Sequence, residues 1–159
     1  MQRRHLIAAA AAVPMFVSMR GALAHHGWSS FDQGRPDYLE GQVGKVTWRN
    51  PHAEFDLEVA PDLKLPADLA TRALPAQSAP VDGPALLKAA QLPKRRDRRW
   101  LIELAPLTRL NAWKVTPLKT GDKVSVLGFT FGGEQGDAIL RAEYLFAGGG
   151  VYGLRSSPA

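Results

Sequence analysis

The clearest pattern along the chain is an alternation of hydrophobic and polar residues in two neighbouring segments. In residues 38–48 the apolar positions alternate and then change parity at Gly44, which indicates a bulge within a strand. Residues 52–59 alternate without interruption. Pro51 separates the two segments, because proline fixes φ and lacks an N–H donor. The two segments are therefore predicted to form a β-hairpin.

Three further strands are predicted at residues 100–105, 123–131 and 138–147 from their apolar patterns. Residues 106–115 carry apolar residues at a spacing of three, which predicts a short helix between the first and second of these strands. The order of three strands, a helix and two strands is that of an OB-type barrel, and closure removes the exposed edges of an open sheet. The predicted fold class is all-β, a small OB-like five-stranded barrel, with an open β-sandwich as the alternative.

Residues 61–97 interrupt the strand pattern. They are rich in proline, alanine and leucine, and the prolines limit helices to short ones at 66–73 and 84–91. We interpret this segment as an insert in the barrel domain rather than as a second domain. It runs into the basic stretch KRRDRR at 94–99, for which a solvated loop edge is favoured over a site for an anionic partner.

The first 24 residues have the organisation of an export signal. Arg3 and Arg4 precede an apolar run at 6–17, and Ala-Leu-Ala at 22–24 is a small-x-small cleavage site. The apolar run is shorter than the roughly 20 residues that a transmembrane helix needs. Residues 1–24 are therefore predicted to be a signal peptide, cleaved near Ala24, with a periplasmic or secreted product and no membrane span.

The remaining chain is predicted to consist of one domain at 25–147 and a loose tail at 148–159, in which one short strand around Val151 and Tyr152 is the alternative to a fully irregular segment. The segment QRRHLI also resembles a twin-arginine export signal, with an ordinary secretory leader as the alternative. Removing the leader takes away three arginines and no acids, so the formal charge of +5 falls to 17 − 15 = +2. A nearly balanced chain gives no indication of a nucleic-acid partner. Because the chain has no cysteine, disulfides and thiolate metal sites are excluded.

The predicted mature chain contains three histidines, His25, His26 and His52. Cleavage after Ala24 would give His25 a free α-amino group, which can chelate a metal together with its own imidazole. A third nitrogen from His52 would complete a planar set that suits Cu(II), and zinc is the second choice. For each histidine alone, a frayed end or a surface position is the alternative. Residues that could support such a site are Asn50, Glu54 and Asp32.

No motif of a hydrolase, zinc protease or nucleotide-binding protein occurs in the sequence, so a binding protein is favoured over an enzyme. The first hypothesis is a periplasmic copper-binding protein. The second is a periplasmic OB-type binding module without a metal, which would use Trp28 and Trp48 to bind an oligosaccharide, a peptide or a protein. The third is a copper or zinc enzyme with an open coordination position. The sequence does not indicate an oligomeric state.

Four segments together resemble a known family: AHHGWSSFD, YLEGQVGKVTWRNPHAEFDLEV, RWLIELAPLTRLNAW and LKTGDKVSVLGF. They are similar to domain-of-unknown-function family 6152, a group of exported bacterial proteins with His-His after the leader and a strand ending in Trp-x-Asn-Pro-His. The resemblance covers most of residues 24–131. The chain departs from it by the insert at 61–97, and by NAW where a Gly-Trp pair is expected. The resemblance implies an exported small β-domain and no specific activity. It draws attention to His25, His26, Asn50, Pro51 and His52.

Overall fold

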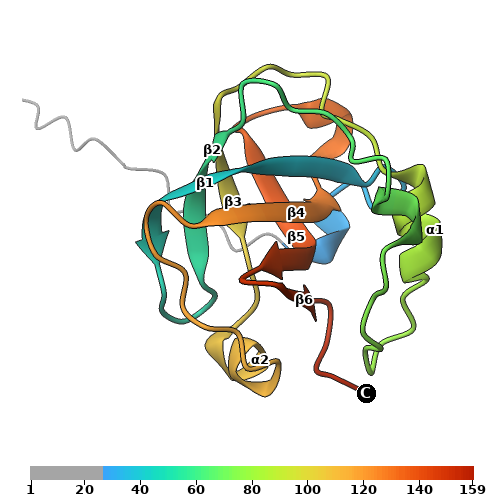
Figure 1. Ribbon diagram of the computed structural model, residues 1–159, viewed down its shortest axis with the longest axis vertical. Helices are drawn as coiled ribbons and strands as arrows, with labels where there is room; N and C mark the ends of the chain where they lie inside the picture. Colours follow the sequence, from blue (N-terminus) through green and yellow to red (C-terminus); the bar gives the residue numbers. More distant parts are fainter. Residues whose placement is uncertain (1–26) are drawn as a thin grey trace, which may run out of the picture.

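The computed structural model describes residues 27–159, so the predicted signal peptide, His25 and His26 lie outside the described residues. The described chain is built mainly from β-strands (Figure 1). The strands are β1 (Asp37–Thr47), β2 (Glu54–Val59), β3 (Arg99–Glu103), β4 (Lys123–Phe129), β5 (Ile139–Ala147) and β6 (Gly150–Gly153). The helices are α1 (Gly83–Ala89), α2 (Leu107–Ala112) and the 3-10 helices η1 (Trp28–Ser30), η2 (Leu69–Thr71) and η3 (Gly132–Glu134). Within this part of the chain, no helix is long and apolar enough to cross a membrane.

Five of the strands close into a barrel. β1 pairs antiparallel with β2 and β4, β2 pairs antiparallel with β3, and β4 pairs antiparallel with β5. The parallel pairing of β3 with β5 completes the ring, and α2 lies between β3 and β4 in the chain, at one end of the barrel in Figure 1. The predicted OB-like five-stranded barrel with one short helix is confirmed. β6 extends the sheet beyond β5 as a sixth strand.

Two irregularities change which residues face the interior. The register of β1 against β2 shifts between Val43 and Val46, which confirms the bulge predicted at Gly44. A second shift lies between β4 and β5, where Leu127 pairs with Tyr144 and the next residue pairs with Ala142. Glu143 is therefore the extra residue of a β-bulge. A bulge locally reverses the alternation of a strand, and this one places an acidic residue in a buried position.

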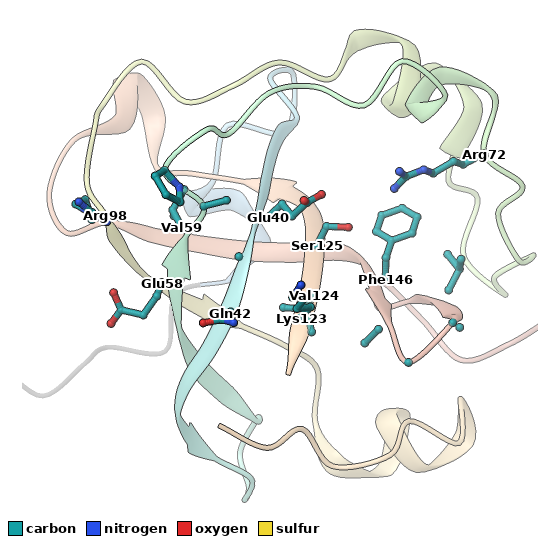
Figure 2. Close-up of a pocket in the computed structure, with 18 residues that line it drawn as sticks. Glu40, Gln42, Glu58, Val59, Arg72, Arg98, Lys123, Val124, Ser125 and Phe146 are labelled. Atoms are coloured by element: carbon teal, nitrogen blue, oxygen red, sulfur yellow. The ribbon is translucent and has the colours of Figure 1, made fainter. Parts of the chain in front are cut away.

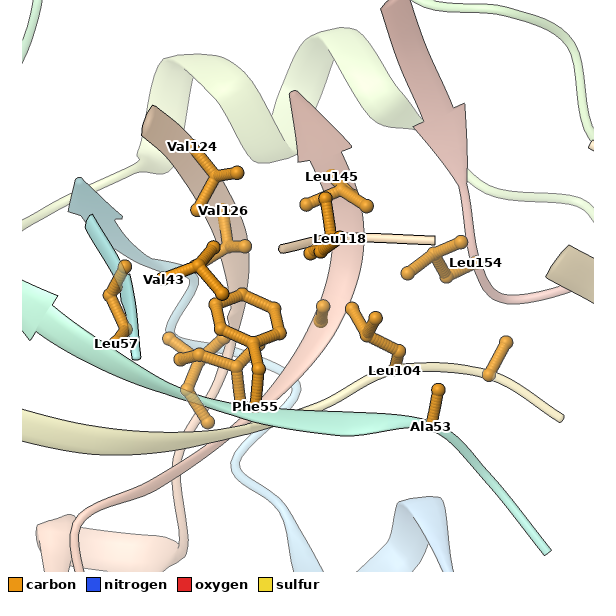
Figure 3. Packing of buried hydrophobic residues seen from close by; sticks show 14 of the residues in the cluster. Val43, Ala53, Phe55, Leu57, Leu104, Leu118, Val124, Val126, Leu145 and Leu154 are labelled. Atoms are coloured by element: carbon orange, nitrogen blue, oxygen red, sulfur yellow. The ribbon is translucent and has the colours of Figure 1, made fainter. Parts of the chain in front are cut away.

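The inward faces of the five strands form the main core. Phe55, Ile102 and Val126 are 0–1% exposed, and they pack with the other residues shown in Figure 3. Trp100 is also buried, whereas Trp48 is half-buried and packs at the edge of the same cluster. Burial of each large apolar side chain contributes about 1.5–3 kcal/mol relative to exposure, so this interior provides the main stabilisation of the barrel.

The insert packs against the outer surface of the barrel. Leu69 of η2 and Leu87 of α1 form a second buried cluster with Tyr38 of β1, Leu127 of β4 and Tyr144 of β5. The predicted short helices at 66–73 and 84–91 correspond to η2 and α1. The insert therefore covers apolar side chains on the outward faces of three strands, which an uncovered barrel would expose to water.

The tail at 148–159 is packed on the barrel rather than loose, and the short strand considered around Val151 and Tyr152 is present as β6. β6 pairs with β5 along four residues, and Leu154 is buried in the main core. The backbone N–H groups of Arg155 and Ser156 donate to the side chain of Gln77 at 3.0 and 3.1 Å. These contacts hold the tail in place. The glycine-rich composition gives no indication of them, because the insert that supplies Gln77 is distant in sequence.

Candidate functional site

His52 immediately precedes β2, and its position is set by the residue that follows it. Ala53 is fully buried, and its backbone N–H donates to the Ala105 carbonyl at 3.2 Å, while its carbonyl accepts from Leu104 at 2.9 Å. These bonds continue the pairing of β2 with β3 beyond the end of the strand. His52 itself is half-buried, with its Nδ1 atom inside the protein. Because side chains alternate along a strand, His52 and Glu54 face outward on the same side.

A row of charged residues leads from the start of β2 across the barrel surface. Glu54 lies opposite Glu103 of β3, and Glu103 lies beside Arg141 of β5. The Arg141 guanidinium pairs with the Glu103 carboxylate at 3.1 Å, and both side chains are largely buried. The outer faces of β2, β3 and β5 therefore carry a continuous strip of polar side chains next to His52.

The described chain begins on this same face. The Trp28 ring lies between two guanidinium groups, with the Cζ atom of Arg155 3.6 Å and that of Arg141 4.8 Å from the ring centroid. The ring also contacts Phe129 edge-on, at 6.3 Å between centroids. A cation over an aromatic ring contributes about 0.5–2 kcal/mol. These contacts fix η1 on the outer face of β5, and Phe31 pairs with Phe131 immediately beyond it.

The other sequence-predicted residues lie in separate surroundings. Asn50 is exposed in the connection between β1 and β2. The Asp32 carboxylate accepts the backbone N–H of Gly34 at 3.2 Å, which closes a local turn. Trp48 packs at the edge of the main core, whereas Trp28 packs on β5 with a different cluster. The two tryptophans therefore do not form a single ligand face.

Metal-ligating side chains do not gather in the part of the chain that the structure describes. Over residues 27–159, there is no group of three or more His, Asp or Glu side chains that could hold a metal ion. His52 with Glu54 provides at most a partial set of donors. A complete site of the predicted kind requires His25 and His26, which lie outside the described residues.

A buried ionic cluster that the sequence does not reveal lies at the start of β1. Asp37 is fully buried, 3.4 Å from the Arg35 guanidinium, and its carboxylate accepts the Thr130 hydroxyl at 3.3 Å. Burial raises the pKa of Asp37 to about 6, although Arg35 opposes the rise. Arg35 also pairs with Glu134 of η3. No local sequence pattern indicates this cluster, because it joins segments about 100 residues apart.

Glu134 connects the same cluster to the insert. Its two carboxylate oxygens accept the backbone N–H groups of Lys94 and Arg95, both at 2.9 Å. Burial raises the pKa of Glu134, but these hydrogen bonds and Arg35 outweigh it and the net pKa is lowered. The basic run, for which a solvated loop edge is favoured from the sequence, is mostly exposed, and part of it holds the glycine-rich loop between β4 and β5.

No curated protein and no solved structure matches the chain at a significant level. A family match covers residues 14–64, just under a third of the chain. Its range includes all three histidines of the predicted site and ends before β3. Over the first hairpin and the segment before it, the chain is therefore similar to the family of unknown function DUF6152, as its sequence motifs predict.

Proposed function

We propose that the protein is exported to the periplasm and binds copper at the N-terminus of its mature chain. In this proposal cleavage follows Ala24, and His25 binds the metal through its α-amino group and its imidazole. His52 supplies a third nitrogen. Nitrogen donors in a planar arrangement suit Cu(II), and His26 offers a further imidazole beside them. Zinc, which accepts the same donors with water, is the second choice.

The observation that carries the proposal is the anchoring of Trp28 on the face that contains His52. Trp28 lies over Arg141 of β5, and β3 separates that strand from β2, which follows His52. Two strand spacings, about 10 Å, lead from Arg141 to Glu54, and His52 lies two residues, about 7 Å, beyond it, so the diagonal is about 12 Å. The three residues from Trp28 back to His25 span up to about 10 Å when extended. In the proposed site the imidazoles of His25 and His52 bridge the remaining distance.

The surroundings of His52 fit a metal ligand chemically. With Nδ1 inside the protein, the proposal assigns Nε2 to the metal. The outward carboxylate of Glu54 lies on the same side and can provide an oxygen ligand or orient a bound water. Bound copper would supply a Lewis-acidic and redox-active centre. The residues of this chain would hold it at the surface of the barrel and fix its orientation.

The proposal is tested by titrating Cu(II) into three forms of the protein. The processed chain beginning at His25 is expected to bind tightly, whereas a form whose α-amino group is acetylated is expected to bind at least about tenfold more weakly, a loss of about 1.4 kcal/mol. Acetylation removes the amine donor and leaves every side chain in place. A His52→Ala variant should lose affinity and change the visible and EPR spectra of the bound copper.

The matched control is His26→Ala, which should retain the chelate of His25 and lose less affinity than His52→Ala. Equal binding by the processed and acetylated forms, or no binding by either, would refute the N-terminal chelate. Unchanged affinity in His52→Ala would remove the third ligand. Mass analysis of the protein isolated from the periplasm tests export itself, since the chelate exists only if the chain begins at His25.

A further inference from the structure

A groove of about 770 Å³ lies on the side of the barrel formed by β1 and β4. Pro61 and Arg72 of the insert and the turn between β5 and β6 also line it, and Figure 2 shows Arg72 on the side where Phe146 lies. This volume is within the range of small-molecule sites, about 300–1,000 Å³. His52, the described ligand of the proposed copper site, does not line it.

The floor of the groove consists of two rows of outward side chains that cross neighbouring strands. One row comprises Glu58 of β2, Gln42 of β1 and Lys123 of β4. The next row comprises Glu40 of β1, Ser125 of β4 and Phe146 of β5. The row beyond these contains Tyr38, Leu127 and Tyr144, which the insert covers. The insert thus buries the apolar row and leaves the two more polar rows open.

Glu40 is held in a fixed orientation in this floor. The buried Tyr38 hydroxyl donates to its carboxylate at 2.6 Å. Burial first, and then the hydrogen bond to Glu40, raises the pKa of Tyr38 to about 12. The phenol therefore remains a donor throughout the neutral range. The hydrogen bond from Tyr38 restrains the Glu40 carboxylate without pairing it with a positive charge.

The cationic side chains that line the groove differ in whether they already form an ion pair with an acidic side chain. Arg72 pairs with Asp68 at 3.1 Å, and its guanidinium lies 5.3 Å from the centroid of Phe146. Lys123 and Arg98 also line the groove, and no ion pair joins either of them to another of the described residues. The groove therefore presents an oriented carboxylate and unpaired cations on one surface.

The spacing of the strand positions that carry the opposite charges indicates the length of a matching ligand. Glu40 pairs with Ser125 and Gln42 pairs with Lys123, so Glu40 and Lys123 are diagonal neighbours across two strands. Diagonal neighbours are about 7–8 Å apart. One residue of an extended chain spans about 3.5 Å and two span about 7 Å. The two strand positions that carry these charges are thus separated by about the length of two extended residues, which favours a peptide of two or three residues over a single amino acid.

We propose that the groove binds a short zwitterionic peptide, with its ammonium group at Glu40, its carboxylate at Lys123 and an apolar side chain beside Phe146. Val151 of β6, which pairs with Phe146, supplies further apolar lining for that side chain. A neutral sugar would leave both charges uncompensated, and a simple anion would be repelled by Glu40. Charge complementarity at both ends therefore favours the peptide.

The test is calorimetric titration with the dipeptide Ala-Leu in a buffer containing EDTA, which prevents copper from contributing. The free dipeptide is expected to bind with a Kd below about 1 mM, and the N-acetylated and C-amidated forms at least about tenfold more weakly. Glu40→Gln should remove the preference for a free amino group, and Lys123→Gln the preference for a free carboxylate. Lys45→Gln, an exposed lysine of β1 outside the groove, should bind like the unmodified protein.

Each alternative ligand class has its own outcome. Equal affinity for the free and blocked dipeptides, or no binding of the free form up to 10-fold above that Kd, would overturn the proposal. Binding of maltose or of inorganic phosphate that depends on Glu40 or Lys123, without binding of the dipeptide, would assign the groove to a sugar or an anion instead. Because the titration uses neither copper nor the N-terminal histidines, its result is independent of the copper site.

Discussion

Replacing Arg155 by alanine is expected to lower the free energy of unfolding by about 3–5 kcal/mol, the usual cost of removing one partner of a buried ion pair. Glu143 is fully buried, and the Arg155 guanidinium is its ion-pair partner at 2.7 Å. Without that cation, Gln77 at 3.3 Å remains as a weaker neutral partner. The variant also loses the cation that lies over Trp28.

The control for this prediction is another arginine–glutamate pair with a similar distance and a different environment. Arg99 binds Glu58 at 2.6 Å, but both side chains are well exposed, so Arg99→Ala should cost no more than about 1 kcal/mol. Urea unfolding of the two variants measures the difference directly, and Arg155→Lys should be intermediate. Similar losses in Arg155→Ala and Arg99→Ala would show that the Glu143 pair is not a buried one in solution.

The effect of Arg155 extends beyond the tail, because three distant segments meet at the ion pair between Glu143 and Arg155. Arg155 follows β6, Gln77 belongs to the insert, and the Arg155 guanidinium also donates to Gln33 near the start of the described chain at 2.7 Å. The same guanidinium supports Trp28. The anchoring of the N-terminal segment, on which the proposed copper site depends, is therefore linked to the last residues of the protein.

Most of the barrel could be predicted because its information is local. The alternation in β2 and the change of parity at Gly44 can be read from consecutive residues, and the positions of β1 and β2 follow from these patterns. The same signal exists at the second bulge, where the inward residues change from Leu140 and Ala142 to Leu145. That change of parity places a bulge between Ala142 and Leu145, although no bulge was predicted there.

The tail and the site depend on contacts that a local pattern does not contain. The tail contacts the insert through Gln77, and nothing in the glycine-rich sequence 148–153 indicates such a partner. The link between Trp28 and His52 requires the parallel pairing of β3 with β5 and the Glu103–Arg141 ion pair. Glu103 lies in the segment RWLIELAPLTRLNAW that resembles the known family, but nothing in the sequence indicates that Arg141, on another strand, is its partner.

The stability of the protein is expected to increase as the pH falls from 7 towards 5, through the protonation of Asp37. Burial raises the pKa of this carboxyl from an ordinary 3.8 to about 6 in the folded protein. Between these two values the folded state binds the proton and the unfolded state does not. The free energy of unfolding therefore decreases as the pH rises through this interval. The full difference between the two pKa values is equivalent to about 3 kcal/mol.

The measurement is urea unfolding of the unmodified protein and of Asp37→Asn between pH 4.5 and pH 7.5, roughly the interval in which the linkage acts. Asparagine retains the shape and can still accept from Thr130, but it cannot titrate. The difference in unfolding free energy between the two proteins should change by about 2–3 kcal/mol over the interval, whereas residues that titrate alike in both cancel. A constant difference would mean that Arg35 and Thr130 stabilise the carboxylate enough to offset its burial. In that case the interior at the start of β1 would hold a charged Asp37 at every pH in the range.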